Sequence, residues 1–189
     1  PNGIDVQRFQ FEPEAREHIR QAFGIENSFL IGCVGRLCYQ KNQMFALRLL
    51  ADVLERDQTF MLMLAGDGAD KEKLRNEAQR LGISSRVLFL GTTDRVHELY
   101  SAMDMLAFPS RFEGFGIVAI EAQASGLPVF CSDRVPKEAV CTRRCERLPL
   151  DRKAWADALI HRRRLDRKER AAASAEAVQE LKRIFDMAH

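Results

Sequence analysis

The sequence contains few of the features that mark membrane-spanning or nucleic-acid-binding proteins. Its longest apolar runs, such as residues 60–65, are far too short to cross a bilayer. Its 29 basic and 27 acidic residues leave a net charge of only +2, which excludes the strong basic excess typical of nucleic-acid-binding domains. Residues 1–5 form a turn sequence, which argues against a signal peptide. Since the chain does not begin with methionine, we expect a fragment whose missing part lies upstream.

Cysteine motifs and two common nucleotide-binding motifs are also missing. The five cysteines are odd in number and include no Cys-x-x-Cys pair, so we expect free thiols rather than a disulfide framework or a zinc site. The segment 32–36 lacks the Gly-x-Gly-x-x-Gly turn of dinucleotide-dependent dehydrogenases, and the chain has no P-loop. These absences disfavour dehydrogenases and P-loop nucleotide hydrolases.

Apolar runs alternate with amphipathic stretches along most of the 189 residues. This order predicts an α/β fold, a Rossmann-like doubly wound parallel sheet with C-terminal helices, in one domain over residues 1–189. We expect strands at residues 29–34, 59–65, 87–90, 105–108 and 129–131, with a weaker edge strand at 147–150. We expect helices at residues 43–55, 69–81, 117–124, 155–165 and 171–187, and one more that Asp94 caps and that ends at Ala102.

The most informative segment is residues 109–121, Pro-Ser-Arg-Phe-Glu-Gly-Phe-Gly-Ile-Val-Ala-Ile-Glu. Glu113 and Glu121 are eight positions apart, which allows both carboxylates to face one ligand from a turn and the helix after it. Gly114 and Gly116 permit close approach of the backbone, and the helix N-terminus directs free N–H groups toward a phosphate. The segment therefore favours a sugar-nucleotide site.

Other loops are expected to meet this segment, because ligands of doubly wound sheets bind beyond the carboxyl ends of the strands. Four polar, glycine-bearing loops share that edge: residues 35–42, 66–68, 91–94 and 109–116. In the first loop, Arg36 and Lys41 can bring two positive charges to one diphosphate. Taken alone, these two residues would be ordinary surface cations. The convergence of four such loops favours an anion site instead.

Several remaining features have structural interpretations. Glu121 lies in a helix that its apolar neighbours predict to be buried, so its carboxylate requires a partner hydroxyl or cation. Trp155 is interpreted as a core residue, and His97 as a surface residue. The basic run at residues 161–168 is interpreted as a solvated helix surface, in preference to a membrane-facing or anion-binding patch.

Taken in order, the motifs resemble the C-terminal, donor-binding domain of the retaining GT-B glycosyltransferases, often called glycosyltransferase family four. The resemblance covers residues 1 to about 150, and each motif is weak alone. It includes Pro-Asn-Gly-Ile-Asp at an interdomain hinge, Gly-Arg-Leu with Gln-Lys-Asn, Ala-Gly-Asp-Gly, Phe-Leu-Gly, the 109–116 segment and Glu-Ala-Gln-Ala-Ser-Gly-Leu-Pro. The loop at 39–43 and the Leu-Pro-Leu sequence at 148–150 are most similar to capsular and exopolysaccharide transferases.

The resemblance implies a role for each site residue. Arg36 and Lys41 would hold the donor diphosphate and stabilise the departing nucleoside diphosphate. Glu113 would orient the donor sugar, and Glu121 would accept hydrogen bonds from the ribose hydroxyls. The implied nucleotide-binding set is Gly35, Gly91, Thr92, Gly114, Phe115, Gly116, Ile117 and Glu121, with the N–H groups of residues 115–117 on the phosphates and the base near residues 90–92.

The donor expected first is a UDP-sugar, with a GDP- or ADP-sugar as the alternative. No cofactor or metal is expected, since no Asp-x-Asp motif is present and cationic side chains and a helix dipole can replace a divalent ion. We expect front-side substitution with retention, and whether Glu113 attacks the sugar stays open. A glycosidase with paired carboxylates is disfavoured, because Glu121 faces the ribose in this interpretation.

Two other functions remain open, a nucleotide-sugar epimerase of the same architecture and a non-catalytic nucleotide-binding module. The acceptor would bind chiefly to an N-terminal domain that this chain lacks, so we expect donor binding with little transfer by the chain alone. The expected acceptor is a glycan or a lipid-linked molecule in bacterial surface polysaccharide synthesis. The expected location is the cytoplasm, with peripheral contact of the full-length protein at the inner membrane face and no nucleic-acid partner.

Overall fold

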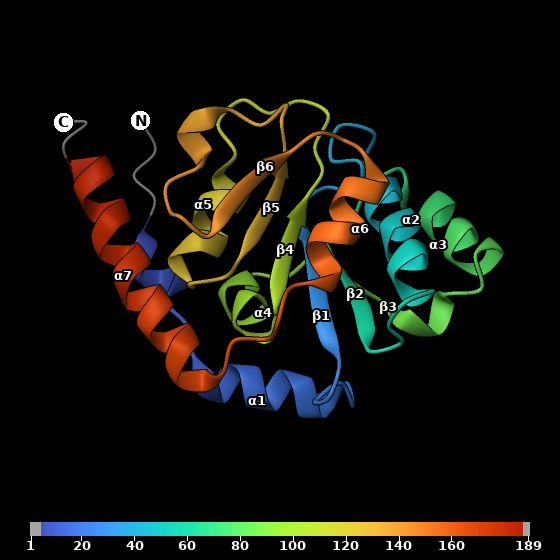
Figure 1. Ribbon diagram of the computed structural model, residues 1–189, viewed down its shortest axis with the longest axis horizontal. Helices are drawn as coiled ribbons and strands as arrows, with labels where there is room; N and C mark the ends of the chain where they lie inside the picture. Colours follow the sequence, from blue (N-terminus) through green and yellow to red (C-terminus); the bar gives the residue numbers. More distant parts are fainter. Residues whose placement is uncertain (1–4, 187–189) are drawn as a thin grey trace.

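The computed structural model describes residues 5–186 and contains one six-stranded parallel sheet (Figure 1). Its strands are β1 (Phe29–Val34), β2 (Phe60–Ala65), β3 (Val87–Gly91), β4 (Met105–Phe108), β5 (Val129–Ser132) and β6 (Cys145–Leu148). Their order across the sheet is β3-β2-β1-β4-β5-β6. The order reverses between β1 and β4, and doubly wound sheets bind their ligands outside such a point.

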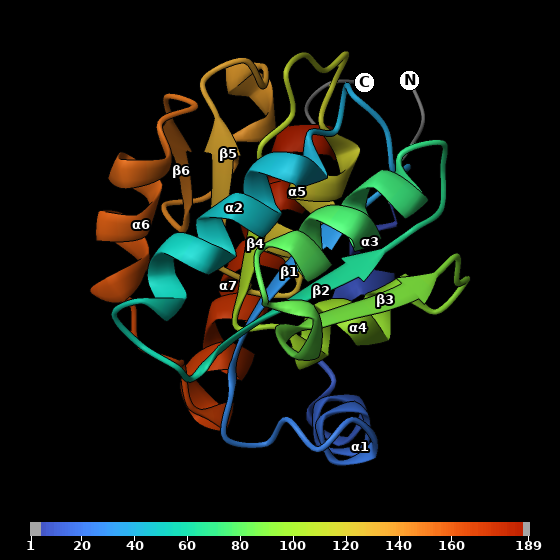
Figure 2. The same ribbon diagram turned by 90° about the vertical axis from the view of Figure 1, so that its right-hand side faces the viewer.

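Helices cover both faces of the sheet (Figures 1 and 2). One face carries α2 (Gln43–Leu54), α3 (Lys71–Arg80) and α6 (Arg152–Ile160). The other face carries η1 (Val6–Phe9), α1 (Pro13–Ala22), α4 (Val96–Ala102), α5 (Ile117–Ala124) and α7 (Arg167–Asp186). Two further 3-10 turns are η2 (Ser84–Arg86) and η3 (Lys137–Ala139). Because both faces are covered, every residue of β1 and β2 is buried and their sequences are continuously apolar or small.

The predicted fold class and parallel sheet are confirmed, and β1 to β5 lie within one residue of their expected bounds. The edge strand β6 exists, but it begins two residues earlier than predicted, at Cys145. The first four residues of the predicted hinge motif, residues 1–4, and the predicted end of the last helix at Met187 lie outside the described residues.

Helix ends were predicted less well than strands. Asp94 does not cap α4; the N-cap is Arg95, whose N–H donates to the side chain of Thr93. Helix α6 begins at Arg152, because the Asp151 carboxylate accepts two N–H bonds of its first turn, and it ends at Ile160 rather than residue 165.

Two helices differ from the sequence analysis at their N-termini: α7 starts earlier than predicted, and α1 was not predicted. Helix α7 begins at Arg167, four residues early, because Asp166 and Glu169 each accept a bond from the other's backbone N–H in a reciprocal capping box. Helix α1 was not predicted, although Pro13 at its first position is a common start signal.

Glycines allow the loops after β1, β2 and β3 to touch. Gly66 has a φ of 142°, and a Cβ there would lie 2.0 Å from the carbonyl oxygen of Gly35. Its N–H donates to the carbonyl of Gly91 at 2.7 Å, and the N–H of Leu37 donates to the carbonyl of Asp67 at 2.9 Å. The three loops therefore form one connected floor at the carboxyl edge of the sheet.

At the opposite edge of the sheet, a buried carboxylate joins segments that are far apart in sequence. The Asp104 carboxylate accepts bonds from Arg16 and Arg20 of α1 and from the N–H of Leu30. Arg164 approaches the same carboxylate at 3.6 Å. Burial lowers the pKa of Arg20 to about 10, and the charge of Asp104 opposes that shift. This cluster fixes α1 and the segment before α7 to the base of the sheet.

The remaining structural interpretations can be checked directly. Trp155 is fully buried, and its indole N–H donates to the carbonyl of Pro149 at 2.8 Å, so its interpretation as a core residue is confirmed. The prediction of a solvated helix surface over the basic run at 161–168 is only partly correct. Arg162 and Arg163 are exposed and pair with Glu146 and Glu169. Residues 161–166, however, lie between α6 and α7, and Arg164 is half-buried. All five cysteines are free.

Candidate nucleotide site

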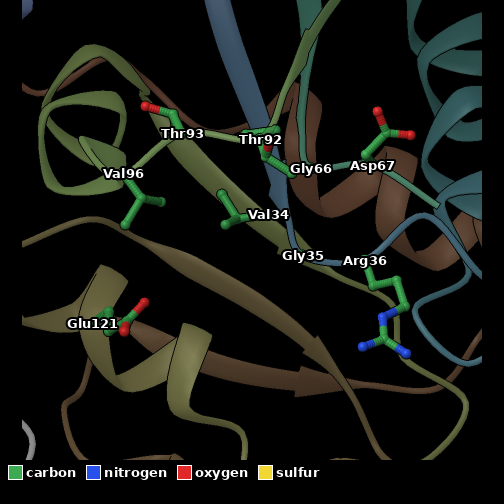
Figure 3. Close-up of a pocket in the computed structure, with 10 residues that line it drawn as sticks. Val34, Gly35, Arg36, Gly66, Asp67, Thr92, Thr93, Val96 and Glu121 are labelled. Carbon is green, nitrogen blue, oxygen red and sulfur yellow. The ribbon is translucent and has the colours of Figure 1, made fainter.

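A cavity of about 350 Å³ opens at the carboxyl ends of β1, β2 and β3 (Figure 3). Its walls come from three loops, from the first turn of α4 and from α5. The lining residues are Val34, Gly35, Arg36, Ala65, Gly66, Asp67, Thr92, Thr93, Val96 and Glu121. The cavity therefore has cationic, anionic and hydroxyl groups around an apolar floor, which suits a ligand with a charged part and a hydroxylated part.

Arg36 supplies the positive end of this cavity. Its side chain is exposed, and its guanidinium group has no hydrogen-bond or ion-pair partner among residues 5–186. Its backbone is fixed, because the side chain of Gln43 donates to the Arg36 carbonyl at 2.9 Å. Figure 3 shows the Arg36 side chain pointing away from that of Asp67 on the neighbouring loop. All five guanidinium N–H donors are thus free for an anion.

Lys41 lies beside the cavity rather than in its lining. Its chain packs along Gly35, where a Cβ would lie 3.5 Å from the Lys41 Cε atom. Its Nζ atom lies 2.7 Å from the Oε1 atom of Glu113 and 5.1 Å from the ring centroid of Phe108. The predicted cation and the predicted sugar-orienting carboxylate are therefore paired with each other.

The Lys41–Glu113 pair joins two loops that also bond through their backbones. The N–H of Arg111 donates to the carbonyl of Gln40 at 2.8 Å, and the side chain of Gln40 donates to the carbonyl of Phe112 at 3.1 Å. The side chains of Lys41 and Glu113 are only 19% and 8% exposed, so the pair is largely shielded from water. Each charge is partly desolvated and is held against its partner.

Glu121 forms the opposite wall of the cavity. The hydroxyl of Tyr100 donates to its Oε2 atom at 2.8 Å, which confirms that this carboxylate has a partner hydroxyl. Burial raises the pKa of Glu121, while the Tyr100 bond and the positive charge of Arg8 act in the opposite direction. Arg8, on η1, donates to the carbonyl of Asp94 at the cavity's outer side. Figure 3 shows the Glu121 carboxylate directed from α5 toward the side of the cavity where Val34 lies.

The start of α5 presents a second group of free donors. Gly116 is the N-cap residue with a φ of 82°, and a Cβ there would lie 3.0 Å from the Cβ atom of Ala139. No N–H group of residues 115–118 donates to an acceptor within the described part of the chain. Phe115 and Ile117 are 42% and 40% exposed, so the start of the helix lies at the surface. An anion in front of them would be stabilised by the helix dipole and by direct bonds.

The predicted site residues thus fall into two neighbouring groups. Gly35, Arg36, Thr92 and Glu121 line the cavity, and Gly91 bonds to Gly66 beneath it. A second group lies on the adjoining loop, outside the lining: Lys41, Glu113, Gly114, Phe115, Gly116 and Ile117. Nothing lies within 4 Å of a Cβ placed on Gly114, so no packing within the protein requires glycine there.

The sequence analysis missed five lining side chains, Val34, Ala65, Asp67, Thr93 and Val96. Val34 and Ala65 are the last residues of β1 and β2. Asp67 and Thr93 belong to the loops at 66–68 and 91–94 that were placed at this edge, so their position was available from the predicted topology. Val96 follows from the helix after the third strand. Tyr100, the partner of Glu121, lies one turn further along the same helix and could be found only from the packing of α4 against α5.

Comparison with known proteins gives a consistent result. Residues 15–146 match the family model described as glycosyl transferases group 1. EpsF of Bacillus subtilis (strain 168), named as a glycosyltransferase, is 42% identical over 139 residues, covering 73% of this chain and 36% of EpsF. The lipopolysaccharide core biosynthesis mannosyltransferase LpsB of Rhizobium meliloti (strain 1021) is 30% identical, covering 70% of this chain and 39% of LpsB.

A solved structure is similar over nearly the whole chain. The crystal structure of Anabaena Alr3699/HepE in complex with UDP and glucose matches with a TM-score of 0.79 and 25% identity, covering 99% of this chain and 54% of HepE. This chain therefore spans between about a third and about half the length of these relatives. Its six parallel strands and flanking helices match the Rossmann-like architecture of GT-B glycosyltransferase structures. The chain belongs to the group 1 glycosyl transferase family.

Proposed function

We propose that this chain is the donor half of a retaining glycosyltransferase and binds a nucleoside diphosphate sugar, foremost a UDP-sugar. The observation that carries the proposal is the cavity beyond β1, β2 and β3, which has the unpaired Arg36 on one side and the Glu121 carboxylate on the other. HepE supports it, because that protein has been crystallised with UDP and with UDP-glucose. The name of LpsB, a lipopolysaccharide core biosynthesis mannosyltransferase, supports a place in bacterial surface polysaccharide synthesis.

In this proposal the ligand spans both groups of site residues. The ribose hydroxyls donate to Glu121, the base lies near Gly91 and Thr92, and the diphosphate accepts bonds from Arg36 and from the free N–H groups at the start of α5. Lys41 adds a second positive charge. Positive groups aimed at the diphosphate stabilise the negative charge that develops on it as it leaves.

In this proposal, ligand binding changes the partners of Lys41 and Glu113. When the diphosphate takes up the charge of Lys41, Glu113 becomes free to accept bonds from the hydroxyls of the donor sugar. In the transfer step the bond between the anomeric carbon and the diphosphate oxygen breaks, and a bond to the acceptor oxygen forms on the same face. The acceptor proton passes to the departing phosphate. Positive side chains and the helix N-terminus carry out the charge stabilisation, and no metal takes part in the proposal.

The acceptor would be held mainly by the part of the protein that corresponds to the remaining length of the relatives. We propose a glycan or lipid-linked acceptor, with the whole protein at the inner face of the cytoplasmic membrane. Among the described residues, no helix combines the length and apolarity needed to span a bilayer.

Isothermal titration calorimetry with UDP, GDP, ADP, UDP-glucose and NAD tests the proposal. We expect saturable binding of UDP and UDP-glucose and none of NAD. Binding of NAD without any nucleoside diphosphate would contradict it. The two alternatives give separate results: conversion of a free nucleotide sugar without acceptor would identify an epimerase, and absence of transfer by the full-length protein despite tight binding would identify a non-catalytic module.

A further inference from the structure

We propose that Tyr100 is a positioning residue, which holds the Glu121 carboxylate charged and oriented toward the ribose hydroxyls of the donor. The inference rests on the proposed function and adds a residue to it. No motif in the sequence points to Tyr100, which lies inside a short helix and is completely buried.

The contact itself is direct. The Tyr100 hydroxyl lies 2.8 Å from the Oε2 atom of Glu121, and no other residue in the described range 5–186 forms a hydrogen bond to this carboxylate. One carboxylate oxygen is therefore fixed by the protein. The other oxygen is available on the side of the cavity. A carboxylate has acceptor capacity for about four hydrogen bonds, so two ribose hydroxyls can be bound while Tyr100 remains in place.

Two contacts hold Tyr100 itself in place. Its ring packs edge-on against Phe9 of η1, with 6.0 Å between ring centroids. Its carbonyl accepts a bond from Arg170 of α7 at 2.9 Å, and the same guanidinium group donates to the carbonyl of Ser125 at the end of α5 at 2.7 Å. Arg170 thus ties α4 to α5, the two helices that carry Tyr100 and Glu121. The hydroxyl therefore occupies a defined position before any ligand binds.

The surroundings of Glu121 explain why such a donor is needed. The cavity wall beside it is apolar, formed by Val34 and Val96, and burial there favours a neutral carboxyl group. Tyr100 on α4 and Arg8 on η1 are the groups that oppose this effect. Burial also raises the pKa of Tyr100 well above its usual value, so the hydroxyl keeps the proton that it donates. A neutral carboxyl group would offer fewer acceptor sites to the ribose.

Calorimetry on the Tyr100→Phe and Glu121→Gln variants, singly and combined, tests this inference. We expect Tyr100→Phe to weaken UDP binding about tenfold, as loss of a bond to a charged group does. Binding of 2′,3′-dideoxy-UDP should change less than about twofold, because the groups that Glu121 binds are missing from it. In the Glu121→Gln background, Tyr100→Phe should add no further loss for UDP.

The matched control is Tyr39→Phe, which removes the other tyrosine hydroxyl of the chain from a side chain that is 67% exposed. It should leave UDP binding unchanged. A thermal melt of each variant separates a folding defect from a binding defect. Titration of the Glu121 carboxyl carbon by ¹³C NMR gives a second readout, in which Tyr100→Phe should raise the pKa of Glu121.

The outcomes separate the two proposals. If wild-type protein binds no nucleoside diphosphate, the proposed function is wrong and the ribose role of Tyr100 falls with it. If wild-type protein binds UDP and Tyr100→Phe binds it equally well, only the inference on Tyr100 is wrong. Equal losses for UDP and for the dideoxy analogue would also overturn it, since they would show a general structural effect.

Discussion

The two edges of the sheet hold their charges in different ways. At the amino edge, Asp104 is surrounded by arginines and a backbone N–H, and Arg20 donates in addition to the carbonyls of Ala102 and Ile25. At the carboxyl edge, Arg36 has no described partner and Glu121 has a single hydroxyl. Charges with complete sets of partners hold the fold together, whereas charges with incomplete sets are available to a ligand.

Cavity size alone would not have separated the two edges. The cavity beside Arg16, Arg20 and Arg164 measures about 390 Å³, slightly more than the 350 Å³ of the candidate site. Its arginines, however, already donate to the backbone and to Asp104. An anion there would have to displace existing bonds. The comparison therefore predicts that substitutions of charged residues at the amino edge lower stability, whereas substitutions at the carboxyl edge lower ligand affinity.

The largest expected effect is on stability at the amino edge. Asp104→Ala removes the partner of the buried Arg20 and of the partly buried Arg16, and loss of one member of a buried ion pair costs about 3–5 kcal/mol. Chemical denaturation should show this loss in the free energy of unfolding. Asp157→Ala, which removes an exposed partner of Arg56, is the control and should change it by less than about 1 kcal/mol. Comparable stability of the Asp104 variant and the control would refute the distinction between the edges.

The next effect is on binding at the carboxyl edge. Arg36→Ala should weaken UDP binding by about 1.5–3 kcal/mol, the usual worth of a hydrogen bond to a charged group, while the melting temperature stays unchanged. Calorimetry and a thermal melt measure the two quantities. Arg75→Ala serves as control, because Arg75 is an exposed cation of α3 paired with Glu72. If the Arg36 variant is less stable than the wild type but binds UDP equally well, Arg36 serves the fold and not the ligand, and the prediction is wrong.

Glu121→Gln should lower affinity and improve stability together. Burial raises the folded-state pKa of Glu121 above its unfolded value of 4.5, so ionisation of this group costs folding free energy. The cost appears as pH rises through the unfolded and then the folded pKa, and it is absent at lower pH. The variant should therefore exceed the wild type in unfolding free energy at pH 7 and match it near pH 3, while UDP binding weakens about tenfold. If the stability of the variant relative to wild type is lower at pH 7 than at pH 3, the predicted direction of this effect is wrong.

The smallest expected effect concerns metal removal. We expect UDP binding by the chain to be the same in EDTA as in Mg²⁺, within about twofold, because Arg36, Lys41 and the α5 N-terminus supply the positive charge. Titrations in matched buffers measure this. Strong dependence on Mg²⁺ would require carboxylate ligands that the proposal does not include.

The sequence predicted the features that repeat or that depend on local chemistry. Continuous apolar runs indicated strands buried on both faces, and glycines marked the loops between them. Helix ends depend on individual hydrogen bonds, such as the reciprocal bonds of Asp166 and Glu169 that start α7 four residues before its predicted position. The site was predicted at the level of loops, because the carboxyl ends of parallel strands necessarily meet at one edge.

Pairings between loops and helices were beyond the sequence. Lys41 and Glu113 are 72 positions apart, and their ion pair forms only because the loops after β1 and β4 lie side by side in the fold. The bond from Tyr100 to Glu121 depends on the packing of α4 against α5, which Arg170 fixes from α7. Such contacts arise from three-dimensional packing, and no local pattern encodes them.

Chemical-shift mapping with UDP-glucose tests the central claim most directly. In ¹H–¹⁵N spectra of the chain, we predict saturable shifts of the amides of Gly35, Gly66, Thr92 and Gly116, around the cavity and the α5 N-terminus. The chemical shifts of the amides of Arg16, Arg20 and Arg164, which lie beside the slightly larger cavity at the other edge, should not change. Shifts confined to the amino edge, or no saturable shifts at all, would contradict the account.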